Sequence, residues 1–325
     1  MKENVFIQKN LDKWKKASDE FNRNSWQNTD MLADMYLDIT SDLAYAQTHY
    51  PDSQIIEGLN NLAFRIHNTI YKKKSGGFKR FMEIWTKELP EIMYESRKML
   101  LLSFIAFMVF TLLGVISQLH DQDYARTVLG DNYVDMTIHN ITAGKPTDVY
   151  SSSTEVSSFL GITFNNLLVD LKTFALGIFT SLGTLFILFY NGIMLGCFQT
   201  FFFQYGVGWE SVLAIWQHGA LEIPACIISG AAGITLGHGW LFPKTYSRME
   251  AFKISAKKGL KIMLAIIPIT VVAGFIEGFI TRHTELPTPL RISTIVIEFA
   301  FIIFYFIILP MKYRKKNNFL NNSSL

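Results

Sequence analysis

The sequence predicts an all-α protein, namely a polytopic α-helical membrane protein of about six spans with an N-terminal cytoplasmic helical bundle. Two compositional observations support this prediction: 50% of the 325 residues are hydrophobic, and only 18% are charged. Charged residues make up about a quarter of an ordinary soluble chain. The third observation is that the first 97 residues contain no long uncharged run, whereas the rest of the chain contains several.

The composition also excludes other classes of protein. The 27 phenylalanines against 9 prolines exclude a disordered chain, and the 2 cysteines exclude a disulfide scaffold. The formal net charge of +3 gives no indication of a nucleic-acid partner, because charge matters only through where it is placed. We expect no nucleic-acid binding.

Residues 1–75 are expected to form the cytoplasmic bundle. Apolar residues recur at steps of three and four along 32–50 and again along 55–70, and each series marks one face of a helix. Pro51 ends the first of these helices. With an earlier helix at 5–21, the segments predict a small antiparallel bundle.

Residues 76–98 are predicted to form an amphipathic interfacial helix. Apolar side chains such as Trp85, Leu89 and Ile92 share one side, and basic residues lie elsewhere. This pattern is typical of a helix lying in the inner membrane interface, where lysines meet anionic head groups. A linker helix packed on the bundle is an equal alternative.

Residues 99–310 are the predicted transmembrane domain. Residues 99–119 carry no charge over 21 positions, which at about 1.5 Å per residue crosses a hydrocarbon core of about 30 Å. The 37 residues at 173–209 contain no Asp, Glu, Lys, Arg or His and predict two spans joined at Asn191-Gly192, since both residues tolerate positive φ. The second of these is short enough to be re-entrant. The six predicted spans are 99–119, 167–190, 193–206, 212–236, 259–280 and 292–309.

The positions of lysine and arginine predict the orientation. They gather before the first span, between the fourth and fifth spans, and in the tail at 311–325. The connection at 120–165 has only Arg126 and Lys145 against six acidic residues. The positive-inside rule then places both termini in the cytoplasm and this loop outside the cytoplasmic (inner) membrane. At about 45 residues, the loop is longer than a connector needs, which indicates an ordered feature or a partner-binding surface.

Four ionisable residues inside the predicted spans share a depth in the outer half of the membrane: His218, Glu222, Glu277 and Glu298. Asp170 is expected near the external end of the second span. Insertion of such a charged side chain into the membrane costs about 2.5–3.5 kcal/mol, so a structural or functional role is expected for each of these residues.

Three interpretations are open. His218, Glu222 and Glu277 could hold a metal, although the zincin pattern His-Glu-x-x-His is missing. The carboxylates could line an ion or proton path. Finally, His218 could pair with Glu222 or Glu277 and fix helix packing. We favour this third interpretation and expect neither metal nor other cofactor.

Small residues predict close helix packing. Gly230, Gly233 and Gly237 fall near one helix face, on which a neighbouring helix can approach closely.

The sequence gives no support for catalysis. No Gly-x-Ser-x-Gly occurs, and Cys197 and Cys226 lie in apolar spans where thiols are inert. No catalytic residues are predicted, and the protein is not expected to be an enzyme.

Several of these motifs resemble the stage II sporulation protein M family. The resemblance is carried by His218-Gly-Ala-Leu-Glu222-Ile-Pro-Ala, by the glycine-rich run from Ser229 to Gly237, and by Ile276-Glu-Gly-Phe-Ile-Thr281. Asn191-Gly192 with Leu195-Gly196, and Asp42-Leu-Ala44 with Leu59-Asn60 and Tyr71, are similar too. In spore formers the resemblance implies a membrane scaffold that holds peptidoglycan-remodelling enzymes, and elsewhere a protein often encoded near a MoxR-type ATPase. It implies no catalytic chemistry.

The hypothesis we favour is therefore a non-enzymatic membrane protein that scaffolds or regulates an envelope complex, for example in cell-wall remodelling. Its expected partners are the lipid membrane, membrane or envelope proteins such as peptidoglycan-remodelling enzymes or a MoxR-type ATPase, and a second copy in a homodimer. The alternative is a transporter or channel that uses the outer-half carboxylates. A third hypothesis is an intramembrane metallo-hydrolase.

Overall fold

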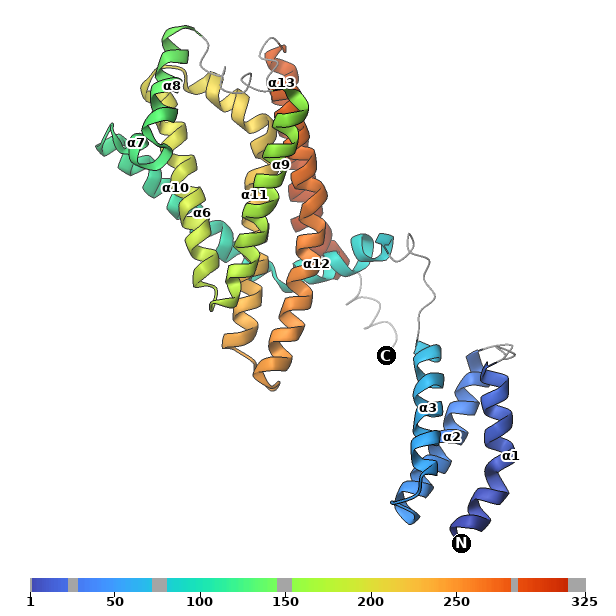
Figure 1. The fold of residues 1–325 in the computed structure, drawn as a ribbon. Helices are drawn as coiled ribbons and strands as arrows, with labels where there is room; N and C mark the ends of the chain where they lie inside the picture. The colour runs from blue at the N-terminus through green and yellow to red at the C-terminus, as the bar shows by residue number, and fades with distance from the viewer. Residues whose placement is uncertain (1, 23–28, 72–80, 145–153, 282–285, 315–325) are drawn as a thin grey trace. The chain divides into compact units, whose positions relative to one another are not determined.

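The computed structural model of the protein describes residues 2–22, 29–71, 81–144, 154–281 and 286–314 (Figure 1). The predicted fold class is confirmed: the structure is 90% helical, no strand occurs among the described residues, and six of their helices are long and apolar enough to cross a membrane. The chain divides into two compact units, Met1–Arg80 and Phe81–Leu325. Several of the charged residues from which the membrane orientation was predicted lie outside the described residues: Lys72, Lys73, Lys74, Lys79, Arg80, Lys145, Asp148, Lys315 and Lys316.

The first unit, which we call the head, consists of α1 (Glu3–Asn22), α2 (Thr29–His49) and α3 (Ile55–Tyr71). All three helices contribute to one hydrophobic core, which includes Phe6 and Trp14 of α1, Ile39 of α2 and Ile66 of α3. The Trp14 indole donates a hydrogen bond of 2.8 Å to the Asp42 carboxylate, so the polar end of this buried ring is satisfied.

The second unit, which we call the membrane unit, contains the six candidate spans and two short helices, α7 and α8, between the first two of them. Its elements are η1 (Ile84–Glu88), α5 (Leu89–Glu95), α6 (Arg97–His120), α7 (Tyr124–Leu129), α8 (Asp131–Thr142), α9 (Glu155–Ala175), η3 (Leu176–Ile178), α10 (Leu182–Gln204), α11 (Gly208–Leu241), α12 (Arg248–Phe275), η4 (Ile276–Thr281), α13 (Thr288–Ile303) and η5 (Phe304–Ile308).

Helix α5 belongs to the membrane unit. Its apolar residues Leu89, Ile92 and Met93 are buried in the same core as residues of α11 and α12. Two ion pairs join η1 and α5 to the middle of α12: Lys258 lies 2.6 Å from Glu95 of α5, and Lys261 lies 2.5 Å from Glu88, the last residue of η1. The apolar side of this segment therefore packs on protein along α5.

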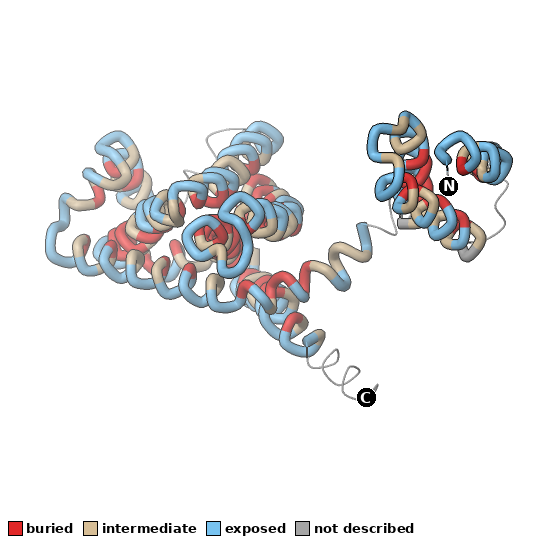
Figure 2. Tube along the Cα trace, turned by 90° about the horizontal axis from the view of Figure 1, so that it is seen from below, coloured by how far each residue is buried: buried red, intermediate tan, exposed pale blue. Residues whose placement is uncertain are grey.

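The spans differ in how much of their surface is buried. Large apolar side chains of α6 and α13 are exposed, as expected for helices that face lipid; examples are Leu112, Ile116, Val296 and Ile297. Helix α11, in contrast, is buried along most of its length and contacts α6, α9, α10, α12 and α13. Figure 2 shows the buried residues gathered in the interior of each unit. Helix α11 is thus the central helix of the membrane unit.

The predicted turn at Asn191-Gly192 is wrong. Helix α10 runs without interruption from Leu182 to Gln204, and its 23 residues span about 34 Å at about 1.5 Å each, enough to cross a membrane. The chain reverses instead between η3 and α10, where Thr180 and Ser181 have φ of +57° and +69°. The second and third spans are therefore Glu155–Ile178 and Leu182–Gln204.

Packing explains why Asn191-Gly192 stays helical. A Cβ on Gly192 would lie 3.0 Å from the Phe107 carbonyl oxygen of α6, so glycine is needed here for close approach of two helices. The Asn191 amide donates to the Ile187 carbonyl one turn earlier, at 2.9 Å. At the true turn, Ser181 Oγ donates to the Ile234 carbonyl of α11 at 3.2 Å and helps to hold an uncommon backbone conformation.

The three glycines predicted to form a packing face lie against α9, η3, α10 and α6. A Cβ on Gly230 would meet Ser103 of α6 and Leu188 of α10, and one on Gly237 would meet Ser181 and the Gly177 carbonyl. At Gly233 the added atom would meet the Thr184 hydroxyl and the Thr173 carbonyl. Close backbone approach along α11 depends on these small residues.

The segment between α6 and α9 forms an ordered pair of helices. Gly130, with φ of +89°, joins α7 to α8, and this conformation favours glycine. Arg126 of α7 contacts Asp135 of α8 at 2.7 Å and Asp131 at 3.3 Å. The expected external feature is thus a helical pair over the described part of this segment, and residues 145–153 lie outside the described residues.

We predict that Gly233→Ala destabilises the membrane unit, because its added methyl group collides with α9 and α10. Overpacking of this kind costs about 1–3 kcal/mol. Gly219→Ala in the same helix is the matched control, since its Cβ would meet only side-chain atoms at 3.5 Å or beyond. Thermal unfolding of the purified protein in detergent measures both variants. Equal melting temperatures for the two variants would contradict the packing role of Gly233.

Candidate functional site

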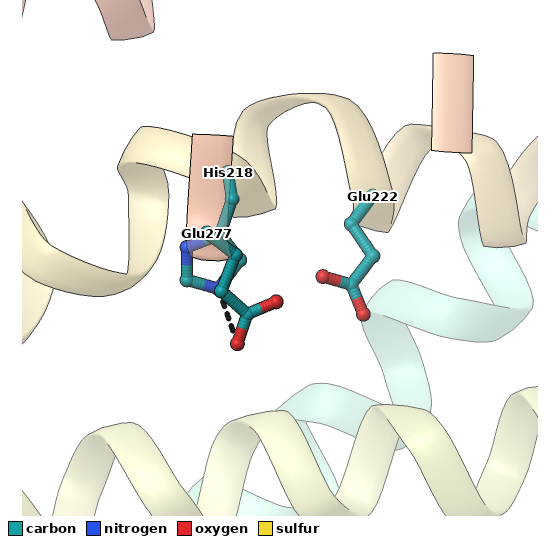
Figure 3. Close-up of side chains that lie close together, drawn as sticks. All are labelled: His218, Glu222 and Glu277. Carbon is teal, nitrogen blue, oxygen red and sulfur yellow. Dashed lines mark ion pairs between the residues drawn. The ribbon is translucent and has the colours of Figure 1, made fainter. Parts of the chain in front are cut away.

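Three of the predicted intramembrane residues come together between α11 and the end of the fifth span. His218 and Glu222 are four residues apart on α11, so they project from one helix face. Glu277 lies on η4, the π-helical turn that continues α12. In Figure 3 the Glu277 carboxylate lies between the His218 ring and the Glu222 carboxylate. We call these three residues the polar triad.

The triad is compact, with His218 buried and the two glutamates half-buried. His218 Nε2 lies 3.7 Å from Glu277 Oε1. One possible ligand atom from each of the three residues lies within 4.8 Å of the others. The other ring nitrogen, His218 Nδ1, lies 3.2 Å from the Thr281 hydroxyl, which also belongs to η4. The imidazole is thus held from both of its nitrogens.

The π-helical turn gives Glu277 and Thr281 their positions. A π-helix widens the ring of the backbone hydrogen bond and is frequent at functional sites. Here it places both residues toward His218. Gly278, between them, allows close approach to α9, because an added Cβ would lie 2.9 Å from the backbone nitrogen of Phe159. The site is therefore built where α9, α11 and η4 meet.

The triad opens into a polar cavity of about 290 Å³. Helix α9 supplies the rest of the lining through Gly161, Ile162, Asn165 and Asn166. A neighbouring cavity of about 450 Å³ shares Asn165, Asn166, His218 and Glu222 with the first. It also reaches Tyr133 of α8 and Asn191 of α10, so residues of the helical pair at α7 and α8 take part in its lining.

Asp170 is placed differently from the prediction. It lies 15 residues after the start of α9, about 22 Å along the helix, rather than near the beginning of the span. Its carboxylate accepts hydrogen bonds from the Thr270 hydroxyl at 2.7 Å and from Ser229 Oγ at 3.1 Å. Asp170 therefore ties α9 to α11 and α12 in the interior of the membrane unit.

The remaining predicted site residues lie elsewhere. Glu298 is buried on α13 but lines neither cavity, and its Oε2 has no hydrogen-bond partner among the described residues. Asn191 lines the larger cavity only. The glycines at 230, 233 and 237 serve helix packing as described above. Of the four ionisable residues predicted at one depth, the structure brings three together.

Sequence reasoning missed three residues of the site: Thr281, Asn165 and Asn166. The asparagine pair is a detectable signal, since two adjacent amides are uncommon in an apolar span and each needs polar partners. Thr281 appeared only as the last residue of a motif that resembles the family, and its contact with His218 depends on the π-helical turn that places it there.

The donor set of the site is one imidazole, two carboxylates and two amides around a small cavity. Such a set can bind a cation or pass protons between carboxylates. It can also hold helices together through the contact of 3.7 Å between His218 and Glu277. The arrangement contains no serine or cysteine nucleophile next to the triad, among the residues that line the two cavities, except Cys226 in an apolar helix.

Comparison with known proteins gives three matches. A sequence profile described as stage II sporulation protein M matches residues 103–282, which is more than half of the chain and includes the triad. A profile for a domain of unknown function (DUF8413) matches residues 4–72, in the head. An uncharacterized protein of Methanocaldococcus jannaschii is 32% identical over 126 residues, which are 38% of this chain and 55% of that protein. The match thus spans about half the length of this relative, and no solved structure matches the chain.

We predict that Asp170→Ala lowers the stability of the membrane unit. The substitution leaves two buried hydroxyl groups, Ser229 and Thr270, without their acceptor, at a cost of about 1–3 kcal/mol for a buried unsatisfied group. Thr270→Val alone should have a smaller effect, and the double variant should show coupling. Glu210→Ala, an exposed carboxylate at the start of α11, is the control. Additive changes in melting temperature would mean that the hydrogen bond between Thr270 and Asp170 contributes no stability.

Proposed function

Because this chain belongs to the stage II sporulation protein M family, we propose that it is a non-enzymatic protein of the cytoplasmic membrane that scaffolds or regulates an envelope complex. The observation that carries the proposal is its division into two parts. A helical head with its own core is joined to a membrane unit that carries a separate ordered helical pair at α7 and α8. In the proposed orientation, the head is a docking surface in the cytoplasm and the helical pair is a docking surface outside.

The proposed orientation places both termini in the cytoplasm and α7 and α8 outside. The turn between α11 and α12 is followed by Lys253, Lys257 and Lys258. It lies at the far end of the membrane unit from α8 (Figure 1). The α7 and α8 end is acidic through Asp131 and Asp135, so the positive-inside rule supports this orientation.

The proposed partners follow from this orientation. Peptidoglycan-remodelling enzymes are candidates for the external helical pair, and a MoxR-type ATPase is a candidate for the cytoplasmic head. The head presents large apolar side chains, since Leu37 of α2 and Phe64 of α3 are each 64% exposed. Exposed apolar residues of this size are suited to partner contacts. A homodimer is a further proposal; the small-residue face of α11 lends it no support, because α6, α9 and α10 of the same chain cover that face.

We predict that the tagged full-length protein, cross-linked in cells and purified in mild detergent, carries envelope proteins with it. Leu37→Glu and Phe64→Glu together should reduce the recovery of cytoplasmic partners at least tenfold without unfolding the head, because both side chains are exposed. Asp38→Ala, an exposed neighbour on α2, is the matched control. Recovery of this chain alone under all these conditions would contradict a scaffold function.

A second candidate function is transport, and the polar cavities favour it. His218, Glu222 and the two asparagines of α9 line both cavities inside the membrane unit. Ionisable residues at membrane depth that face a cavity commonly mark an ion or substrate path.

Flux measurements in proteoliposomes test the transport candidate. If the cavities form a path, the wild-type protein should conduct protons, a metal cation or a small anion, and Glu222→Gln should reduce the flux at least tenfold. Glu298→Gln, which changes a buried carboxylate outside both cavities, should conduct normally. Absence of flux for protons, metal cations and small anions would rule the candidate out.

A further inference from the structure

We propose that His218, Glu222 and Glu277 form a binding site for a divalent transition-metal ion of the zinc class. The ligands would be the Nε2 nitrogen of His218 and one carboxylate oxygen from each glutamate. The proposal does not depend on the scaffold function, because it concerns only the geometry and charge of the polar triad.

The spacing of the donor atoms fits a metal. Zinc binds imidazole nitrogen and carboxylate oxygen at about 2.0–2.2 Å, so tetrahedral ligands lie about 3.4 Å from one another. His218 Nε2 and Glu277 Oε1 are 3.7 Å apart, close to this separation. The three donor atoms lie within 4.8 Å of one another, so a rotation of the Glu222 or Glu277 carboxyl group brings all three to metal-ligand separations.

The hydroxyl group behind His218 is the second observation that indicates a ligand. Metal-binding histidines usually engage their other ring nitrogen with an oxygen atom, which fixes the tautomer and the direction of the ring. Thr281 Oγ1 lies 3.2 Å from Nδ1. When Nδ1–H donates to this hydroxyl, the lone pair of Nε2 faces the Glu277 carboxylate. Two acceptors then face each other, and a cation between them relieves their repulsion.

The net charge of the triad also favours a bound cation. Two carboxylates inside a membrane unit need compensation, because an unpaired buried charge is costly. Neither cavity is lined by a lysine or an arginine, judged from the described residues that line them. A divalent cation neutralises two glutamates. Imidazole among the ligands favours transition metals over Mg²⁺ and Ca²⁺, which prefer oxygen-only sets.

The cavity leaves room for further ligands. Three protein ligands complete only part of a zinc coordination sphere, and sites of this kind keep one position for water or another molecule. Asn165 and Asn166 line the same space of about 290 Å³ and can hydrogen-bond to a metal-bound water. The site would therefore be an open one rather than a closed structural site.

Metal analysis of the full-length protein tests the proposal. The protein is purified in detergent, freed of its affinity tag, stripped with a chelator and incubated with ZnCl₂ before gel filtration. We expect about one Zn²⁺ per chain by elemental analysis, and a rise in melting temperature on addition of zinc, because a ligand that binds only the folded state stabilises it. Mg²⁺ and Ca²⁺ at the same concentration should not produce this rise.

Isosteric variants identify the ligands. Glu222→Gln and Glu277→Gln should each weaken zinc binding by more than tenfold and abolish the thermal shift. Thr281→Val should weaken it by about 10–100-fold, the usual effect of losing the oxygen behind a metal-binding histidine. Glu298→Gln is the matched control, because it changes a buried carboxylate away from the triad, and it should bind zinc as the wild type does.

Two results would overturn the proposal. One is the absence of stoichiometric zinc in wild-type protein that elutes as a folded species. The other is zinc binding of equal strength in Glu222→Gln and Glu277→Gln, which would place the metal elsewhere. Should a glutamine variant fail to elute as a folded species, Co²⁺ bound to the wild type gives an independent readout, since visible absorption bands of tetrahedral cobalt require coordination inside the protein, and their absence counts against the site.

Discussion

The membrane unit depends on the close packing of α11. Glycine and alanine residues along this helix let α6, α9 and α10 approach its backbone, as the contacts that a side chain would meet at Gly230, Gly233 and Gly237 demonstrate. Lipid tails are as apolar as leucine, so helices in a membrane gain little from hydrophobic burial and associate through van der Waals contact and hydrogen bonds. The small residues make both possible, and as a result α11 lies in the centre of its unit.

Burial of α11 gives His218 and Glu222 their surroundings. On a helix that faced lipid, these side chains would lie in hydrocarbon, whereas on the central helix they face η4 and α9. The π-helical turn then presents Glu277 and Thr281 to the same histidine. Asp170 of α9 accepts hydrogen bonds from hydroxyl groups of α11 and α12 because these three helices also pack closely. Packing of small residues thus creates an interior in which polar groups find partners.

The scaffold and the metal site are compatible. The proposed docking surfaces are the head, which is a compact unit with its own core, and the helical pair at α7 and α8, which packs on α10. The triad lies inside, and its neighbouring cavity extends to Tyr133 of α8. A ligand in the cavity therefore has a physical connection to one of the proposed docking surfaces, through side chains that line the same space.

The sequence by itself determined the helical class, the six apolar helices, the head with its periodic core and the candidate residues His218, Glu222 and Glu277. Periodicity and long uncharged runs are local properties, so they can be read along the chain. Only the tertiary structure decided that Asn191-Gly192 is helical, that the chain turns at Thr180 and Ser181, and that Glu298 stays apart from the triad. Each of these depends on contacts between distant segments. Gly192 is required by α6 rather than by a turn, and Thr281 acquires its role from a π-helical turn beside α11.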